Sequence, residues 1–371
     1  MARTMRAYRR FGPGDVRLVE VPRPIPGPGD VLLRPYLSGI CGTDLHVLHG
    51  EGLKDIPVPI TMGHEVCGEV VELGRDASVP GPYPRTGAPL HPGDRVVAEP
   101  VLPCGHCYYC RRGQPNVCPN MSHLGIWQDG NFADFVVVPA WRATRVPDAV
   151  SDIDGLLVEV AACSVNCVDQ AELRAGETVL IVGGGPMGQM TAQCALAAGA
   201  GLVILSEPNA HRREVAARAG VHATVSPTEE DVIECVRSLT GELGVDVAVE
   251  CVGIEATVRQ AIDATRRRGR CVLSGLPDRP VSLDLSGIVF GEKRIVGSLA
   301  SAWQFGRTID LIASGRIHPS LMVDAVRPFP ELVNALEEAR SRPDLCKVVI
   351  DHQTGRTLAT SNNAGRTVDV R

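Results

Sequence analysis

Four cysteines lie close together in one short segment, at Cys104, Cys107, Cys110 and Cys118. Their spacings of three, three and eight positions allow one tetrahedral ion to collect all four thiolates. Soft thiolates with no other ligand type are typical of a closed, structural zinc site. Redox pairs of cysteines usually precede a helix and do not cluster in fours, so zinc is favoured over a redox dithiol.

A second group of possible metal ligands has a different composition. Cys41 lies in the segment GICGTDLH at 39–46, and His64 and Glu65 end the segment GHE at 63–65. A catalytic zinc takes three protein ligands and keeps a fourth position open for water or substrate. Neighbouring side chains of an extended strand point to opposite faces, so His64 and Glu65 bind one ion together only if the backbone bends.

Two further residues are candidates to complete this ligand shell. Glu159 interrupts an apolar run, where an unpaired carboxylate is costly and a metal ion would satisfy it. Cys163 lies four residues later, on the same face of a helix, and is a fallback ligand. The alternative for Glu159 is an ordinary carboxylate at a helix start. The residues alone leave open whether Glu65, Glu159 or Cys163 completes the shell.

A glycine-rich loop, GGGPMG at 183–188, directly follows an apolar strand pattern at 179–182. Glycines in the GxGxxG pattern allow a tight turn, close approach of a pyrophosphate and close helix packing. Glu207 follows about 20 residues later, where a carboxylate accepts hydrogen bonds from a ribose 2′-hydroxyl and repels a 2′-phosphate. We therefore expect NAD, although Arg212 and Arg213 nearby would suit NADP. The expected nucleotide-binding residues are Gly183, Gly185, Pro186, Met187, Gly188, Glu207 and Arg212.

The pattern of residue types along the chain changes near residue 156. Before it, short β-branched runs between glycines and prolines predict a partly open β-domain. After it, strands and helices alternate, which predicts an α/β fold with a doubly wound parallel sheet. We expect a catalytic domain at 1–155 and 297–353, a Rossmann nucleotide-binding domain at 156–296 and a polar tail at 354–371. The expected helices span 186–198, 210–219, 229–240, 255–267, 304–314 and 331–341, and the main expected strands span 31–34, 69–73, 94–98, 132–138, 178–182, 202–206, 222–225, 245–250, 270–274 and 347–350.

The composition limits the possible partners. At 371 residues the chain is long enough for two hydrophobic cores. A net charge of -6 argues against nucleic acid as a partner, because such binding needs clustered lysine and arginine. No apolar stretch is long enough to cross a bilayer, and no secretory signal is evident, so we expect a cytoplasmic protein with small-molecule partners. Thirteen cysteines, an odd number, favour reduced thiols and metal ligation over disulfides.

These motifs together resemble the zinc-containing medium-chain dehydrogenases of the alcohol dehydrogenase superfamily, from about residue 6 to residue 351. Within it, the chain looks most like the polyol branch of sorbitol, butanediol and threonine dehydrogenases. The resemblance implies a GroES-like β-barrel beside the Rossmann sheet, one catalytic and one structural zinc, NAD, and a homodimer or homotetramer. The segments that carry it are GICGTDLH at 39–46, MGHE at 62–65, GDRVV at 93–97, CGHCYYC at 104–110, DGNFADFVVVP at 129–139, Glu159, GGGPMG at 183–188 and Glu207.

The resemblance also implies a set of catalytic zinc ligands. In that family the positions of Cys41 and His64 bind the metal, and the position of Glu65 lies beside it. The position of Glu159 ligates the metal directly or through water. The polyol branch usually has proline after this glutamate, whereas this chain has Val160.

Three residues near Cys41 are expected to serve the reaction. Thr43 matches the family's hydroxyl that touches the reacting oxygen, and His46 matches the histidine that passes the proton to solvent. The unperturbed pKa of histidine lies near neutrality, which suits that task. Asp44 is expected to hold the tautomer of the liganding His64, and its alternative role is that of a turn-forming residue.

The motifs and the resemblance together imply a zinc-dependent oxidoreductase that transfers a hydride between NAD(H) and a secondary alcohol or ketone. We expect a polyol, vicinal diol or cyclitol-like substrate, because an acid beside the metal favours a polar compound. The alternatives are an L-threonine-type amino alcohol dehydrogenase, an NADH-dependent ketone reductase, and a non-catalytic, crystallin-like binding protein on the same fold. Walls of the substrate pocket are expected at 50–58, at Trp127 and at 300–303.

Overall fold

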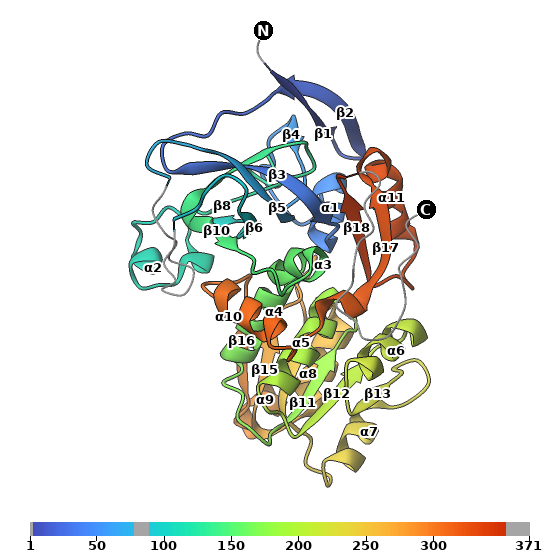
Figure 1. Cartoon of the computed structure of the whole chain (residues 1–371). Coiled ribbons are helices and arrows are strands. Elements are labelled where there is room, and N and C mark those ends of the chain that lie inside the picture. Colours follow the sequence, from blue (N-terminus) through green and yellow to red (C-terminus); the bar gives the residue numbers. More distant parts are fainter. Residues whose placement is uncertain (1–2, 78–88, 354–371) are drawn as a thin grey trace.

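The alternating second half of the chain forms a six-stranded sheet in the computed structural model, which describes residues 3–77 and 89–353 (Figure 1). The expected polar tail at 354–371 lies outside these residues. The strand order is β13-β12-β11-β14-β15-β16, and each pair of neighbours is parallel. The strands are β11 (Thr178–Val182), β12 (Leu202–Ser206), β13 (Ala223–Val225), β14 (Val245–Glu250), β15 (Thr265–Leu273) and β16 (Arg294–Gly297).

Helices connect these parallel strands, as a parallel sheet requires. They are α5 (Pro186–Ala197), α6 (Ala210–Arg218), α7 (Val232–Leu239), α8 (Glu255–Ala264) and α9 (Leu285–Phe290). The helix expected at 229–240 begins later, because the Asp231 carboxylate accepts the backbone N–H groups of Ile233 and Glu234 and caps α7. The helix expected to reach residue 267 ends at Ala264, because the chain enters β15 at Thr265. The doubly wound α/β fold is confirmed.

The first part of the chain, together with two strands from residues 323–351, builds a mostly antiparallel sheet in the order β10-β6-β5-β3-β18-β17, with β9 also paired to β3. These strands are β3 (Asp30–Gly39), β5 (Glu65–Leu73), β6 (Arg95–Ala98), β9 (Val136–Pro139), β10 (Ala143–Arg145), β17 (Val323–Pro328) and β18 (Lys347–Asp351). The strand expected at 132–138 begins only at Val136, because the N–H groups of Asn131 and Phe132 bond to Gly63 and Met62. Two small sheets flank it, formed by β1 (Thr4–Gly12), β2 (Asp15–Pro22) and β4 (Ile60–Thr61), and by β7 (Val101–Leu102) and β8 (Ser122–His123).

The helix α4 (Val158–Gln170) lies between the two large sheets (Figure 1). One core cluster contains Leu157 and Val160 from this region together with Phe305 and Val349, so residues from both ends of the chain pack around α4. None of the described helices combines the length and the apolar content needed to span a membrane. The remaining helices are α1 (Gly42–His49), α2 (Tyr108–Arg111), α3 (Asp152–Leu156), α4 (Val158–Gln170), α10 (Phe305–Ala313) and α11 (Leu332–Ser341).

Candidate active site

The four-cysteine segment folds around the short helix α2. The Sγ atoms of Cys107 and Cys110 lie 3.5 Å apart, those of Cys107 and Cys118 lie 3.7 Å apart, and those of Cys118 and Cys104 lie 3.6 Å apart. Zn–S bonds of about 2.3 Å give a tetrahedron with edges of about 3.8 Å, so this donor set fits one zinc ion.

Ionisation within this cysteine cluster is uneven. The backbone N–H of His106 helps to lower the pKa of Cys104 to about 6. Burial and the neighbouring Cys107 thiol raise the pKa of Cys110 to about 12. Crowded thiols therefore resist losing all their protons together, and a divalent cation removes that resistance.

Cys41, His64 and Glu65 form the second cluster, and their ligand atoms all lie within 4.8 Å of one another. Cys41 is the N-cap of α1, His64 directly precedes β5, and Glu65 is the first residue of that strand. Gly63, with a φ of 90°, turns the chain immediately before them. His64 and Glu65 are 3% and 1% exposed and Cys41 is half-buried, so this largely buried donor set fits a metal ion.

Asp44 links α1 to the buried imidazole. One of its carboxylate oxygens accepts the N–H of Cys41 at 2.9 Å, and the other lies 3.3 Å from His64 Nδ1. Burial alone lowers the pKa of His64, but the Asp44 carboxylate outweighs it and the net pKa is raised. Because Nδ1 faces Asp44, Nε2 is left to be a metal ligand. Asp44 therefore contacts both the start of α1 and the buried imidazole.

Lys347 is a member of the site that the sequence did not predict. Its Nζ lies 2.6 Å from the Glu65 carboxylate, and both side chains are 1% exposed. Burial lowers the pKa of Lys347, but Glu65 and Cys41 hold it above the usual value. A lysine at the start of an otherwise apolar strand was the available signal. His123 also lies beside His64, with ring centroids 5.3 Å apart.

Glu159 and Cys163 lie near this cluster but outside the set of three. Both belong to α4, and the Cys163 thiol points to the Glu159 carboxylate with Sγ and Oε1 3.5 Å apart. Burial and the negative charge of Glu65 raise the pKa of Glu159. A carboxyl group close to Glu65 is one that a cation would stabilise in its ionised form.

Thr43 and His46 lie three residues apart in α1, which places them on one face of that helix. The His46 side chain is 43% exposed, and its Nδ1 lies 4.0 Å from Glu51. This face of α1 therefore reaches solvent at His46.

The glycine loop joins β11 to α5 with the geometry that the motif predicts. Gly183 has a φ of 97°, a conformation that favours glycine. A Cβ on Gly188 would lie 1.7 Å from the Gly183 carbonyl oxygen, so only glycine fits there. Pro186 and Met187 open α5, whose first N–H groups face the loop and suit a pyrophosphate.

Glu207 lies at the carboxyl end of the neighbouring strand β12. Its oxygens accept the N–H groups of Gly184 at 2.6 Å and Asn209 at 2.8 Å, and the residue is 4% exposed. Arg212 reaches toward the same loop, with Nη1 4.0 Å from where a Cβ on Gly185 would stand. Its Nη2 donates to the Leu345 carbonyl at 2.7 Å. These contacts place both residues at the glycine loop.

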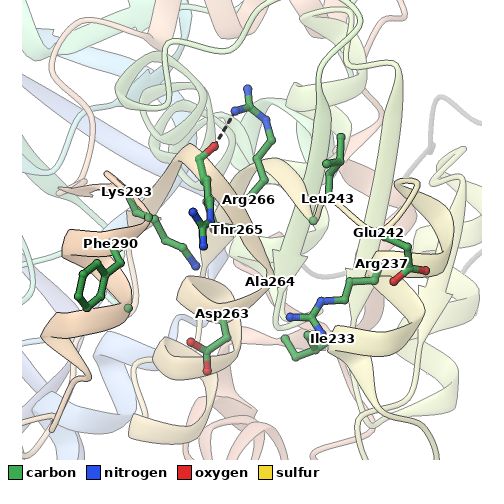
Figure 2. A pocket seen from close by; sticks show the side chains of 14 residues that line it. Ile233, Arg237, Glu242, Leu243, Asp263, Ala264, Thr265, Arg266, Phe290 and Lys293 are labelled. Atoms are coloured by element: carbon green, nitrogen blue, oxygen red, sulfur yellow. Dashed lines mark hydrogen bonds between the residues drawn. The ribbon is translucent and has the colours of Figure 1, made fainter.

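A cavity of about 770 Å³ lies at the amino ends of the parallel strands, away from the glycine loop and where α7 and α8 end (Figure 2). Its basic side chains include Arg237, Arg266 and Lys293. Cations are favoured at helix C-termini, and Lys293 Nζ donates to the Ile262 carbonyl of α8 at 2.6 Å. Arg266 pairs with Asp246 at 2.7 Å. These cations serve helix ends and an ion pair, and the cavity is separate from the clusters described above.

The fold and the site together define a class of protein. A Rossmann sheet with a nucleotide loop lies beside a β-domain that holds two donor sets suited to zinc, as in two-domain, metal-dependent oxidoreductases. Residues 27–148 match the family model "Alcohol dehydrogenase GroES-like domain", and residues 186–314 match "Zinc-binding dehydrogenase". The chain belongs to the zinc-containing medium-chain alcohol dehydrogenase superfamily.

Curated relatives and solved structures agree with this assignment. L-threonine 3-dehydrogenase of Pyrococcus horikoshii is 36% identical over 348 residues, which cover 92% of this chain and 97% of the relative. A structure described as a zinc-binding dehydrogenase of Sinorhizobium meliloti, bound to NADP, has a TM-score of 0.85 and 35% identity, and covers 94% of this chain and 99% of its own. The 2R,3R-butanediol dehydrogenase of Bacillus subtilis has a TM-score of 0.84 and 28% identity, with 94% and 100% covered.

The chain is therefore an enzyme, an alcohol dehydrogenase that uses zinc and a nicotinamide dinucleotide. This excludes the non-catalytic, crystallin-like alternative.

Proposed function

We propose that this enzyme transfers a hydride between NAD(H) and a secondary alcohol or ketone, with a polyol, vicinal diol or cyclitol-like compound as substrate. The observation that carries the proposal is the cluster of half-buried Cys41 with buried His64 and Glu65. Its thiolate, imidazole and carboxylate are the donors of a catalytic zinc with a position left for substrate. Glu159 supplies a further acid beside it, which suits a hydroxyl-rich compound.

Zinc, when bound, supplies a Lewis acid for the substrate oxygen, and the nicotinamide supplies the hydride acceptor. In this proposal Cys41 and His64 hold the ion, and Asp44 fixes the imidazole tautomer through Nδ1. Glu65, tied to Lys347, and Glu159 contribute negative charge to the shell. Cys163 is the fallback ligand.

Proton transfer runs along α1 in this proposal. The Thr43 hydroxyl orients the substrate hydroxyl and takes part in removing its proton. His46 lies on the same face and is partly exposed, so its imidazole hands the proton to solvent.

Glu207 supports NAD over NADP as the coenzyme. Its buried carboxylate stands at the end of β12, where it accepts hydrogen bonds from a ribose diol and repels a 2′-phosphate. Arg212 is assigned to the pyrophosphate, because its guanidinium reaches the glycine loop.

A second substrate class is favoured by a separate observation. Relatives named L-threonine 3-dehydrogenase cover most of this chain, at 36% identity in the Pyrococcus horikoshii protein. An amino alcohol is therefore the competing substrate, and an NADH-dependent ketone reductase is the same chemistry run in reverse. An NAD-reduction screen of zinc-loaded enzyme against diols, polyols, aminocyclitols and L-threonine separates these classes. Turnover of L-threonine alone would refute the polyol assignment.

Variants test which cluster is catalytic. Cys41→Ser or His64→Ala is expected to abolish turnover and to leave NADH binding intact, because the glycine loop lies on another domain. NADH fluorescence titration beside a zinc assay measures both properties. A Cys41→Ser enzyme with full activity and a full complement of metal would refute the assignment.

We propose the domain division expected from the sequence, 1–155 with 297–353 and 156–296, because β17 and β18 join the sheet of β3. A homodimer or homotetramer is supported by the edge strand β16 and by the nearby Val289 and Phe290, which are 72% and 80% exposed. A cytoplasmic location is supported by the thirteen free thiols. Sedimentation analysis tests the oligomer, and a monomer would refute it.

A further inference from the structure

The loop at 298–303 follows β16 at the edge of the sheet that binds the nucleotide. Dinucleotides lie across the carboxyl ends of parallel strands, with the pyrophosphate at the glycine loop after β11. Glu207 places the adenosine ribose on the β12 side. The nicotinamide half must then extend the other way, over β14, β15 and β16. The 298–303 loop therefore lies along the nicotinamide half of the cofactor.

The same loop lies close to the metal-site face of α4. Glu159, Cys163 and Asn166 are spaced at four and three residues, so they share one face of that helix. The first two lie beside the zinc cluster. Asn166, one turn further, is 2% exposed and donates through Nδ2 to the loop, with the Ala300 carbonyl at 3.0 Å and the Leu299 carbonyl at 3.3 Å.

The segment of the four cysteines, residues 104–118, also contacts the loop, and we refer to it as the four-cysteine lobe. Asn116, 8% exposed and two residues before the ligand Cys118, donates to the Leu299 carbonyl at 2.8 Å. Trp303 Nε1 donates to the Gly113 carbonyl at 2.9 Å. The carbonyl of Leu299 is thus shared by two buried amides, one from the lobe and one from α4.

The loop backbone needs such support. Ala300 has a φ of 48°, in the left-handed region that residues with a Cβ rarely adopt. Strained conformations of this kind persist only when surrounding contacts fix them, and they occur often at sites of chemistry. The two asparagines bond the carbonyls of Leu299 and Ala300, on either side of the strained peptide.

We propose that Asn116 and Asn166 are positioning residues, which hold the 298–303 loop against the nicotinamide half of the cofactor. The four-cysteine lobe is then a part of the coenzyme site as well as a structural element. The inference rests on the proposed nucleotide-dependent function. It implies that the four-cysteine lobe helps to place the nicotinamide ring for hydride transfer.

The test compares NADH with ADP-ribose, which lacks the nicotinamide, by calorimetric titration of the full-length, zinc-loaded enzyme. Asn116→Leu keeps the side-chain size and removes the donor. We expect it to weaken NADH binding by about 3- to 10-fold, the net contribution of one hydrogen bond, and to leave ADP-ribose binding unchanged. The kcat for the best alcohol falls by a similar factor. Asn116→Gln, which keeps the amide, remains closer to the wild type.

Thr178→Val is the matched control. It removes two hydrogen bonds, in which the Thr178 hydroxyl donates to the Asp246 carboxylate at 2.8 Å and accepts the Asp246 N–H at 2.9 Å. These bonds lie at the amino end of β11, so the variant reports general destabilisation. If Asn116→Leu changes NADH and ADP-ribose binding equally, or no more than Thr178→Val, the proposal is wrong. Trp303→Phe removes a second lobe contact and serves if Asn116→Leu fails to fold. A wild-type enzyme that binds NADH but oxidises no alcohol would instead refute the proposed function. The comparison of NADH with ADP-ribose would still test the positioning role of Asn116.

Discussion

Replacing Lys347 by methionine isolates the buried charge pair at the metal centre. Methionine keeps an unbranched side chain and removes the ammonium group, which lies 2.6 Å from the Glu65 carboxylate with both side chains 1% exposed. Removing one partner of such a pair leaves an uncompensated buried charge and costs about 3–5 kcal/mol. We expect the metal-free Lys347→Met enzyme to lose a free energy of unfolding of about this size.

Zinc should reduce this loss. A divalent ion beside Glu65 compensates the carboxylate that the missing ammonium group leaves behind, so the variant regains stability when metal is added. Equilibrium urea unfolding of the metal-free and zinc-loaded forms measures both effects. The double variant Glu65→Gln/Lys347→Met should be more stable than Lys347→Met when metal-free, because it contains no buried charge at this pair.

Arg340→Met is the control, since Arg340 forms an exposed pair with Glu337 and its loss should change stability little. Equal stability of Lys347→Met and the double variant would refute the reasoning, because the cost would then not come from an unpaired charge. A loss in Lys347→Met that zinc does not reduce would show that Glu65 lies too far from the ion to be compensated.

The other predictions concern the second metal, the coenzyme and acid stability. Cys104→Ser should halve the zinc content and lower the thermal midpoint, because three thiolates hold the ion less well than four; elemental analysis with a melting scan checks this, and unchanged zinc content would contradict it. Glu207→Ala should raise the kcat/KM ratio of NADP to NAD, because it removes the carboxylate that repels a 2′-phosphate; an unchanged ratio would contradict the assignment. Burial lowers the pKa of His352 to about 3, below the ordinary value of 6.5, so the unfolded chain binds more protons between these pH values. The stability that this neutral histidine contributes is present above pH 6.5 and is lost as the pH falls through that window, at about 1.4 kcal/mol per pH unit. In His352→Gln the urea unfolding midpoint should depend less on pH than in the wild type, whereas His91→Gln, at an exposed position, should keep the wild-type dependence. Equal pH dependence of the midpoint in both variants would contradict the assignment.

The metal donor sets could be predicted because their members are close in the sequence. Four cysteines within one short segment indicate a zinc site by type and spacing, and Cys41 ahead of His64 and Glu65 indicates a second metal site whose remaining ligand stays open. The parallel sheet could be predicted for a similar reason, since strand and helix periods alternate along the chain.

Contacts between distant segments could not be predicted in this way. Lys347 meets Glu65 across 282 residues, and only the pairing of β18 with β3 brings them together. The hydrogen bonds from Asn116 and Asn166 to the 298–303 loop likewise depend on how the four-cysteine lobe and α4 pack against the parallel sheet. Helix ends were missed where a local side chain decided them, as with the Asp231 cap of α7.

The pairing of β18 with β3 has a consequence for synthesis on the ribosome. A nascent chain that has made β3, His64 and Glu65 still lacks its partner strand, because Lys347–Asp351 emerges only after the whole parallel sheet has been translated. Until then the end of one edge of β3, at Leu37–Gly39, has no partner strand, although β9 pairs with Asp30–Leu33 of the same edge. Glu65 has no ammonium beside it at this stage. The surroundings of Glu65 are therefore completed only when β18 is made, and until then the Leu37–Gly39 backbone is open to chaperones and to aggregation.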